Sequence, residues 1–157
     1  MTRILRAEEI FDAAHDDALF DQLAARLAQV VGARSGVLHW RRRDDAGEEE
    51  VSYSGYFSAA DMARFEGDFA RDDLWSVAIN RPEARNRLWK LQDLVAPDDY
   101  AGSRIYNEWI RVIGDDTAHA LGAAIDLPEV TLELGFHRGK SQRAFDGDAV
   151  AQLEQHL

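Results

Sequence analysis

The stretch "DTAHALGAAIDLPEVTLELGFHR", from Asp116 to Arg138, decides the fold. It contains two runs of strand-type residues, 116–126 and 130–138, joined across Leu-Pro-Glu, which predicts a β-hairpin. Because side chains alternate along a strand, the second run should point Leu132, Leu134 and Phe136 to one face, and Glu133, Gly135 and His137 to the other. One face of the first run carries very small side chains: Ala118, Ala120, Gly122 and Ala124. Such a face either lets a helix approach closely or leaves a hollow.

An earlier part of the chain predicts a second hairpin. "SGVLHWRRR" (35–43) reads as a strand, "DDAG" (44–47) as a turn, and "EVSYSGYF" (50–57) as the returning strand. Before this hairpin, apolar residues recur at helical spacing over 17–31, and Gly32 stops the pattern. The two hairpins together predict a largely antiparallel sheet.

Helices should fill the segments around the hairpins. Ser58 is a predicted N-cap, with Asp61 at the capping-box position, for a helix that runs to about 68–71. A short extended stretch is expected at 88–91, and then a helix from Pro97 or Asp98 to Ile113, ended by Gly114. A last helix begins after Asp146. This order predicts an α+β fold with a central antiparallel sheet flanked by helices, of the PAS/GAF-like type.

Length and charge narrow the function classes. The 157 residues fit a single domain, 1–157, in which we expect 1–14 to be an N-terminal extension. A net charge of −11 would repel a phosphate backbone, so the chain should not bind nucleic acid by itself. No apolar run is long enough to span a bilayer, which argues against a membrane partner. The chain has no cysteine and no secretory signal, and we expect a cytoplasmic protein.

No motif in the chain names a reaction. "HRGKS" (137–141) lacks the glycine spacing of a phosphate-binding loop, because Leu134 stands where the first glycine should be. His39, His119 and His137 all fall on predicted strands but have no tight ligand spacing, so hydrogen-bonded histidines are a better interpretation than a metal site. The paired aspartates mostly sit where Asp caps backbone amides. We therefore predict no catalytic residues, no metal and no cofactor.

The aromatic residues are more informative. Tryptophan and tyrosine bury a large area yet carry a polar group that needs a partner, which suits both a core and the wall of an amphipathic pocket. The segment "SRIYNEWIRVIGDD" (103–116) raises this question most directly. We expect a cavity between sheet and helices, lined by polar-tipped aromatics: Trp40, Tyr56, Trp89, Tyr106 and Trp109.

Several stretches resemble one known family. "GYFSAADMARFEGDFARDDLW", "NRLWKLQDLV", "YNEWIRVIGDDTAHALGAAID" and "GFHRGKSQRAFDGDAVAQLEQHL" together resemble the N-terminal sensor domain of LuxR-type transcriptional regulators. The resemblance implies a PAS/GAF-like fold, a small-molecule ligand, a homodimer, and DNA binding through a C-terminal helix-turn-helix domain that this chain does not include. In the autoinducer-binding branch an Asp and a later Trp touch the ligand, which implies Asp73 and Trp89 here. Leu74 stands where that branch has proline, and the ligand's identity stays open.

Three functions are thus in competition. The first is a regulatory sensor that binds an unknown amphipathic or aromatic ligand. The second is a stand-alone dimerisation or protein-interaction module, and the third a small enzyme. A homodimer is expected in part because Val150, Leu153 and Leu157 form an apolar stripe at the end of the chain. An enclosed pocket would favour the sensor, whereas a filled core would favour the interaction module.

Overall fold

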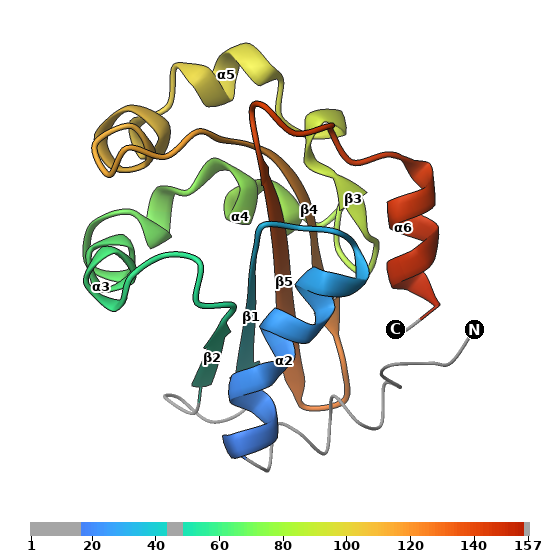
Figure 1. Cartoon of the computed structure of the whole chain (residues 1–157). Helices are drawn as coiled ribbons and strands as arrows, with labels where there is room; N and C mark the ends of the chain where they lie inside the picture. The colour runs from blue at the N-terminus through green and yellow to red at the C-terminus, as the bar shows by residue number, and fades with distance from the viewer. Residues whose placement is uncertain (1–16, 44–48, 156–157) are drawn as a thin grey trace.

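The computed structural model describes residues 17–43 and 49–155. The predicted N-terminal extension and the turn at 44–47 lie outside these described residues. The remaining prediction of an α+β fold is confirmed: a five-stranded antiparallel sheet has helices packed around it (Figure 1). No helix in 17–43 or 49–155 has both the length and the apolar composition needed to cross a membrane.

The sheet has the strand order β2-β1-β5-β4-β3. Its strands are β1 (Ser35–Arg42), β2 (Glu49–Tyr53), β3 (Trp89–Lys90), β4 (Thr117–Asp126) and β5 (Val130–Gly139). Both predicted hairpins are present, and β5 pairs with β4 and β1 together. The register sets Gly122 of β4 opposite Gly135 of β5, and Val37 of β1 on the other side of Gly135. β2 ends at Tyr53, earlier than predicted, because the chain turns at Gly55, whose φ is 87°.

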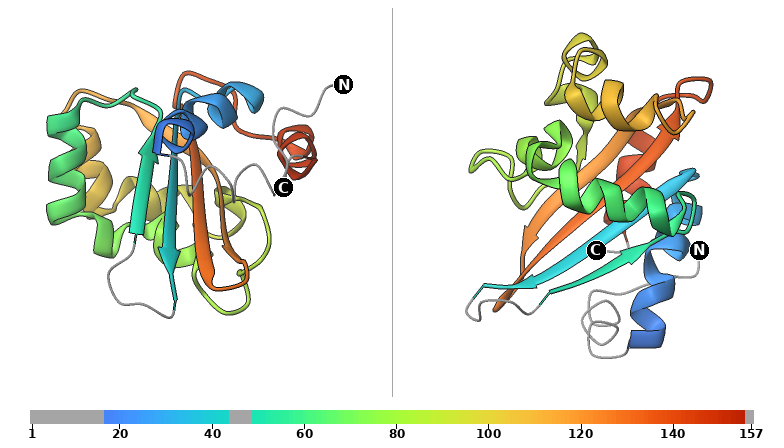
Figure 2. Two further views of the ribbon diagram at one scale, coloured as in Figure 1. Left: turned by 90° about the horizontal axis from the view of Figure 1, so that it is seen from below. Right: turned by 90° about the vertical axis from the view of Figure 1, so that its left-hand side faces the viewer.

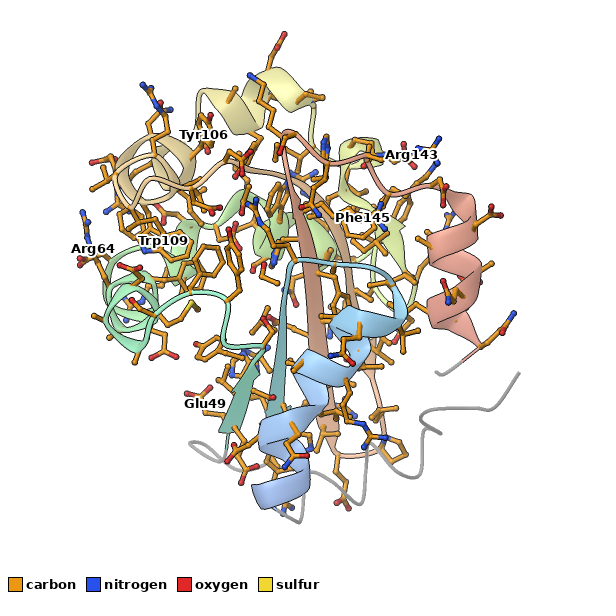
Figure 3. All side chains as sticks on the ribbon, in the orientation of Figure 1. Glu49, Arg64, Tyr106, Trp109, Arg143 and Phe145 are labelled. Atoms are coloured by element: carbon orange, nitrogen blue, oxygen red, sulfur yellow. The ribbon has the colours of Figure 1, made fainter. Side chains whose placement is uncertain are left out.

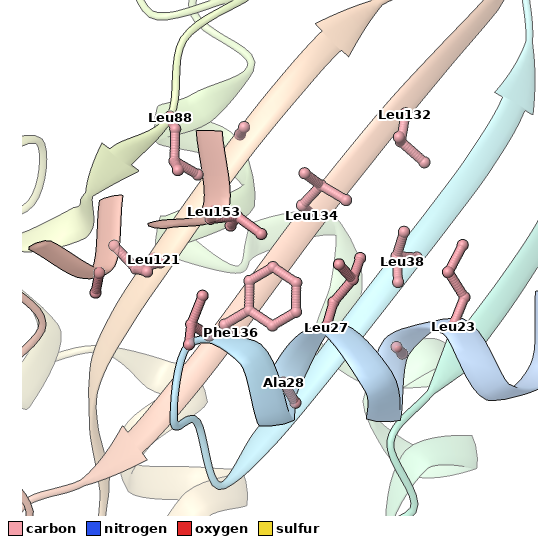
Figure 4. Close-up of a cluster of buried hydrophobic side chains, with 14 of the residues drawn as sticks. Leu23, Leu27, Ala28, Leu38, Leu88, Leu121, Leu132, Leu134, Phe136 and Leu153 are labelled. Atoms are coloured by element: carbon pink, nitrogen blue, oxygen red, sulfur yellow. The ribbon is translucent and has the colours of Figure 1, made fainter. Parts of the chain in front are cut away.

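One face of the sheet is covered by α2 (Asp17–Val30) and α6 (Gly147–Glu154), as Figures 1 and 2 show. Leu38 of β1 and Leu134 and Phe136 of β5 point to this face and pack against Leu27 of α2 (Figure 4). All four side chains are fully buried. The alternation predicted for β5 therefore places its large residues in a closed core, which we call the filled face.

Helix α6 corrects the prediction that its apolar stripe awaits a second copy of the chain. Asp146 caps the helix as predicted, its side chain accepting a hydrogen bond from the Ala149 amide at 3.0 Å. Leu153, however, is completely buried in the filled face together with Ala149 and Phe145. The stripe folds back onto its own sheet, with Leu153 fully buried and Val150 partly buried against the same cluster. Leu157 lies outside the described residues.

The opposite face meets a layer of short helices. These are α3 (Ala59–Asp68), η1 (Ala70–Asp72), α4 (Leu74–Ile79), η2 (Leu91–Asp93), α5 (Pro97–Ala101) and η3 (Tyr106–Ile110), the last a π-helical turn. The N-cap prediction for Ser58 is confirmed, since its hydroxyl accepts from the Asp61 amide at 3.1 Å. Figure 2 shows this layer on the other side of the sheet from α2.

The predicted continuous helix from Pro97 to Ile113 is wrong. It breaks after α5, at Gly102 and Ser103, before a second helical segment that includes η3. The Ser103 hydroxyl donates to the Tyr100 carbonyl at 2.6 Å and accepts from the Tyr106 amide at 3.2 Å. One side chain thus serves the end of the first segment and the start of the second, which explains the break. Gly114, with φ 78°, ends the second segment as predicted.

Candidate functional site: a cavity under the helical layer

A cavity of about 960 Å³ lies between the sheet and this helical layer. Its floor is formed by the side of β1, β4 and β5 that faces away from α2, including Val37, Gly122 and Gly135. Its roof comes from the helical layer, including Phe65, Trp75 and Trp109. The face of very small side chains predicted on β4 lets α4 and η2 approach closely, because Ile79 and Leu91 pack on Ala120 and a methyl group on Gly122 would lie 3.1 Å from Leu91 Cδ2. Ala120 and Gly122 also border the cavity. We call this side of the sheet the hollow face.

An aromatic cluster forms the apolar wall. The Trp109 ring lies 5.0 Å from that of Phe57 and 5.2 Å from that of Phe65, measured between centroids. Its indole N–H donates to the Asp61 carbonyl at 3.0 Å, so the ring is held between η3 and α3 (Figure 3). Its polar group is satisfied by protein, and the ring offers the cavity an apolar surface.

A second aromatic group stacks deeper in the cavity. Trp75 lies 4.3 Å from the ring of Tyr100 at an interplanar angle of 12°, and 5.6 Å from that of His137 at 22°. The Tyr100 hydroxyl donates to the Thr117 carbonyl at 2.6 Å, and burial raises the pKa of Tyr100. Burial also lowers the pKa of His137 to about 4, so this imidazole is neutral at physiological pH.

Asp73 is a buried carboxylate on the cavity wall. It caps α4, accepting from the Trp75 amide at 3.3 Å and from the Ser76 hydroxyl at 2.9 Å. Burial raises the pKa of Asp73, although hydrogen bonds from Ser76 and Trp75 act in the opposite direction. A carboxylate has about four lone-pair sites, so Asp73 can accept a further bond from the cavity in addition to those from Trp75 and Ser76.

Charged groups gather near the start of β5. Glu133 accepts from Asn80 Nδ2 at 3.1 Å and lies 3.4 Å from Arg41 Nη2. His39 contacts Glu49 at 2.8 Å across β1 and β2. These side chains line the cavity at the end far from His137. The cavity therefore has one polar end, and the rest of its wall is largely aromatic.

A hydrogen-bonded cluster closes the rim. The Tyr56 hydroxyl donates to Asp115 Oδ1 at 2.7 Å, and the Arg34 guanidinium lies 4.7 Å above the Tyr56 ring. Arg34 also binds Asp115 at 3.0 Å and Asp116 at 2.8 Å. This cluster ties the loop before α3 to the starts of β1 and β4.

The structure brings three of the six predicted site residues to the cavity: Tyr56, Asp73 and Trp109. Trp40 does not belong there, because it shares the filled face with Leu38, two residues before it on β1. Its indole N–H is buried without a hydrogen-bond partner among the described residues.

Trp89 and Tyr106 are also absent from the cavity lining. Trp89 lies on the edge strand β3, where its indole N–H donates to the Ala84 carbonyl at 2.9 Å and Arg87 stacks on its ring. Tyr106 packs 5.2 Å from Tyr100, the ring that separates it from Trp75. Sequence reasoning missed Trp75, Tyr100 and His137. For His137 a signal existed, because it alternates in step with Gly135 on the face opposite Phe136.

Similar folds occur among solved structures. The ligand-binding domain of VqsR from Pseudomonas aeruginosa matches with a TM-score of 0.57 at 19% identity, over 94% of this chain and 85% of that one. CepR2 from Burkholderia cenocepacia, an N-acylhomoserine-lactone-dependent LuxR-family transcription factor, matches with a TM-score of 0.52 at 17% identity, over 95% and 88%. The chain has the fold of a LuxR-type ligand-binding domain.

SdiA in complex with octanoyl-rac-glycerol also matches, with a TM-score of 0.54 at 16% identity, over 99% of this chain. The present chain spans 60% of the length of that SdiA chain. No protein-family model and no curated protein sequence matches. The LuxR-type sensor-domain fold implied by the sequence resemblance is therefore supported by three-dimensional structure at low sequence identity.

Proposed function

We propose that this chain is the small-molecule sensor domain of a LuxR-type transcriptional regulator, with its ligand in the cavity of the hollow face. One observation carries the proposal: a cavity of about 960 Å³ occupies the space where an ordinary domain would have a packed core. Aromatic walls and a few convergent polar groups, including Asp73, are what an amphipathic ligand requires. The similar folds of VqsR and CepR2 support the same function.

The regulatory partners belong to the same proposal. DNA would be bound by a separate C-terminal domain of the whole protein, because the charge of −11 opposes phosphate contacts by this domain. The homodimer would use a surface other than the described part of α6, whose Leu153 is buried within its own chain. The hollow face favours a sensor over a stand-alone interaction module, for which a filled core was the expected feature.

Ligand binding can be tested with two acyl probes, octanoyl-rac-glycerol and N-octanoyl homoserine lactone. A probe at a hundred times its Kd should stabilise the fold by about 2.7 kcal/mol. For a domain of this size that shift corresponds to a rise of about 5–10 °C in Tm. Trp75→Phe should diminish the accompanying change in tryptophan fluorescence, whereas Trp40→Phe on the filled face should preserve it. If neither probe changes Tm or fluorescence, the proposal of an acyl-compound sensor fails.

A further inference from the structure

His137 is held from two sides at the floor of the cavity. The register sets it opposite Ser35 of β1, whose hydroxyl lies 3.0 Å from His137 Nδ1. The Trp75 ring stacks on the imidazole from the helical layer. Since a β1 hydroxyl and an α4 ring constrain it together, the imidazole has a defined orientation.

The partner of Nδ1 determines which ring nitrogen carries the proton. Ser35 is 2% exposed, and the contact with His137 is the hydrogen bond that the structure gives its hydroxyl. If Ser35 donates to Nδ1, the hydroxyl proton is satisfied; if it only accepts, that proton is buried without an acceptor, which is costly. The network therefore assigns the imidazole proton to Nε2. The low pKa of His137, about 4, keeps the ring in this neutral form.

His137 lines the cavity, and its Nε2 lies beside the backbone of Gly135 on the cavity floor. A methyl group built on Gly135 would lie 3.2 Å from Val37 Cγ1, 3.5 Å from His137 Nε2 and 3.6 Å from its Cε1, so these two side chains border the floor at this point. Gly135 and its cross-strand neighbour Gly122 both line the cavity, and Leu91 and Ile79 pack over Gly122. Among the described residues no acceptor bonds to Nε2, so the cavity wall carries a neutral donor without a partner.

We propose that His137 donates a hydrogen bond from Nε2 to the carbonyl oxygen of an acyl ligand seated over Gly135. The inference rests on the proposed sensor function and goes further by naming the recognising group and the ligand chemistry. An unpaired neutral donor that has lost part of its hydration favours a strong acceptor such as a carbonyl oxygen. The alkyl part of the acyl group would extend along the aromatic wall made by Phe57, Phe65 and Trp109.

A matched pair of probes isolates the carbonyl. Octanoyl-rac-glycerol and 1-O-octyl-rac-glycerol share the eight-carbon chain and the glycerol, but only the ester carries a C=O. Titration calorimetry should show the wild-type chain binding the ester about tenfold more tightly than the ether, as expected for one buried hydrogen bond. In His137→Phe the ester should fall to the affinity of the ether, while the ether should bind as before. His137→Gln, which retains an N–H donor, should restore part of the preference.

The outcomes separate the role of His137 from the sensor function itself. If His137→Phe keeps the wild-type preference for the ester, the role of His137 is refuted while the sensor function stands. If the wild-type chain binds neither glycerol probe nor N-octanoyl homoserine lactone, both the acyl-sensor function and this inference are overturned. Circular dichroism checks that the variants fold. Should His137→Phe not fold, His137→Gln and Ser35→Ala carry the test, because Ser35→Ala frees the tautomer and should reduce the ester preference by about twofold to fivefold.

Discussion

The two faces of one sheet are packed differently: one is a closed core and the other borders a cavity. On β5, Leu134 and Phe136 enter the filled face, while Gly135 and His137 line the hollow face. On β1, Leu38 is fully buried and the next residue toward the N-terminus, Val37, borders the cavity. Because alternation sends neighbouring residues to opposite sides, a single strand can supply stability to one side and binding surface to the other. Substitutions should therefore be tolerated better on the hollow face than on the filled face.

The energetic difference follows from packing. A closed core gains dispersion contacts and removes apolar area from water, and a void forgoes both. The filled face should therefore carry most of the stability of the domain. The hollow face should contribute less, and a ligand can supply the contacts that are missing there.

Phe136→Ala should have the largest effect. The ring is completely buried, and a methyl group built on Gly36 would lie 3.0 Å from its Cδ1, which shows how closely the strands enclose it. Truncation of such a residue costs about 3–5 kcal/mol. Phe65→Ala on the roof of the cavity, where the ring is only half-buried, should cost about 1 kcal/mol. Urea unfolding measures both, and equal losses would contradict the contrast between the faces.

The pH dependence of the hollow face should come next in size. The pKa of His137 is lowered from 6.5 to about 4 by burial and by the Arg34 charge, while Asp115 acts in the opposite direction. Between these two values the unfolded chain binds a proton that the folded chain does not, so the free energy of unfolding should fall as pH drops from 6.5 toward 4. The full loss attributable to this group is about 3 kcal/mol.

His137→Phe provides the control for that pH dependence. Other acids, such as Asp126, whose pKa is lowered to about 2 mainly by Arg85, titrate in both proteins and cancel in the comparison. The difference in unfolding free energy between wild type and variant should therefore change steadily between pH 6.5 and 4.5. Parallel curves over this interval would show that His137 is not desolvated in the folded state.

Substitutions that enlarge a side chain provide a further test of the difference between the filled face and the hollow face. Leu38→Phe enlarges a side chain that has no room, which should destabilise the fold by about 1–3 kcal/mol. Val37→Phe, one position away, extends a side chain into the cavity and should change stability by less than about 0.5 kcal/mol. If the proposed site is correct, the same variant should weaken binding of octanoyl-rac-glycerol by an order of magnitude or more, since the larger side chain would fill part of that site. If Val37→Phe destabilises as much as Leu38→Phe, the hollow face is closed in solution.

Much of the fold could be predicted because local signals agree with it. Alternation on β5, the caps at Ser58 and Asp146, and the turn-forming residues between elements each act over a few residues. The helix break at Ser103 was not predicted. A serine hydroxyl can bond to the backbone either within a helix or at its end, and the sequence does not distinguish the two cases.

The site was harder to predict because it depends on which strands are neighbours. That β1 pairs with β5, which sets Trp40 opposite Leu132 on the filled face, is a long-range fact. Polar-tipped aromatics indicate a pocket or a core equally well, so Trp40, Trp89 and Tyr106 were placed by residue type alone. Tyr56, Asp73 and Trp109 do line the cavity, and whether they bind a ligand stays a prediction.

The smallest effect is expected at the rim, with Tyr56→Phe. Burial and the hydrogen bond to Asp115 raise the pKa of Tyr56 to about 12, yet the side chain is 41% exposed, so water competes for the bond. Removing the hydroxyl should lower stability by less than about 1 kcal/mol in urea unfolding. In a phenolate absorbance titration, the tyrosine that ionises near pH 12 should disappear from the variant.

Tyr53→Phe is a weak control for that titration, because the pKa of Tyr53 is raised as well, by burial and by its bond to Glu66. Asp115→Asn is the better one, since it retains the Tyr56 ring and should move its ionisation back toward pH 10. If Tyr56→Phe lowered the free energy of unfolding by several kcal/mol, the cluster of Tyr56, Arg34 and Asp115, rather than the strands beneath it, would be what keeps the cavity open.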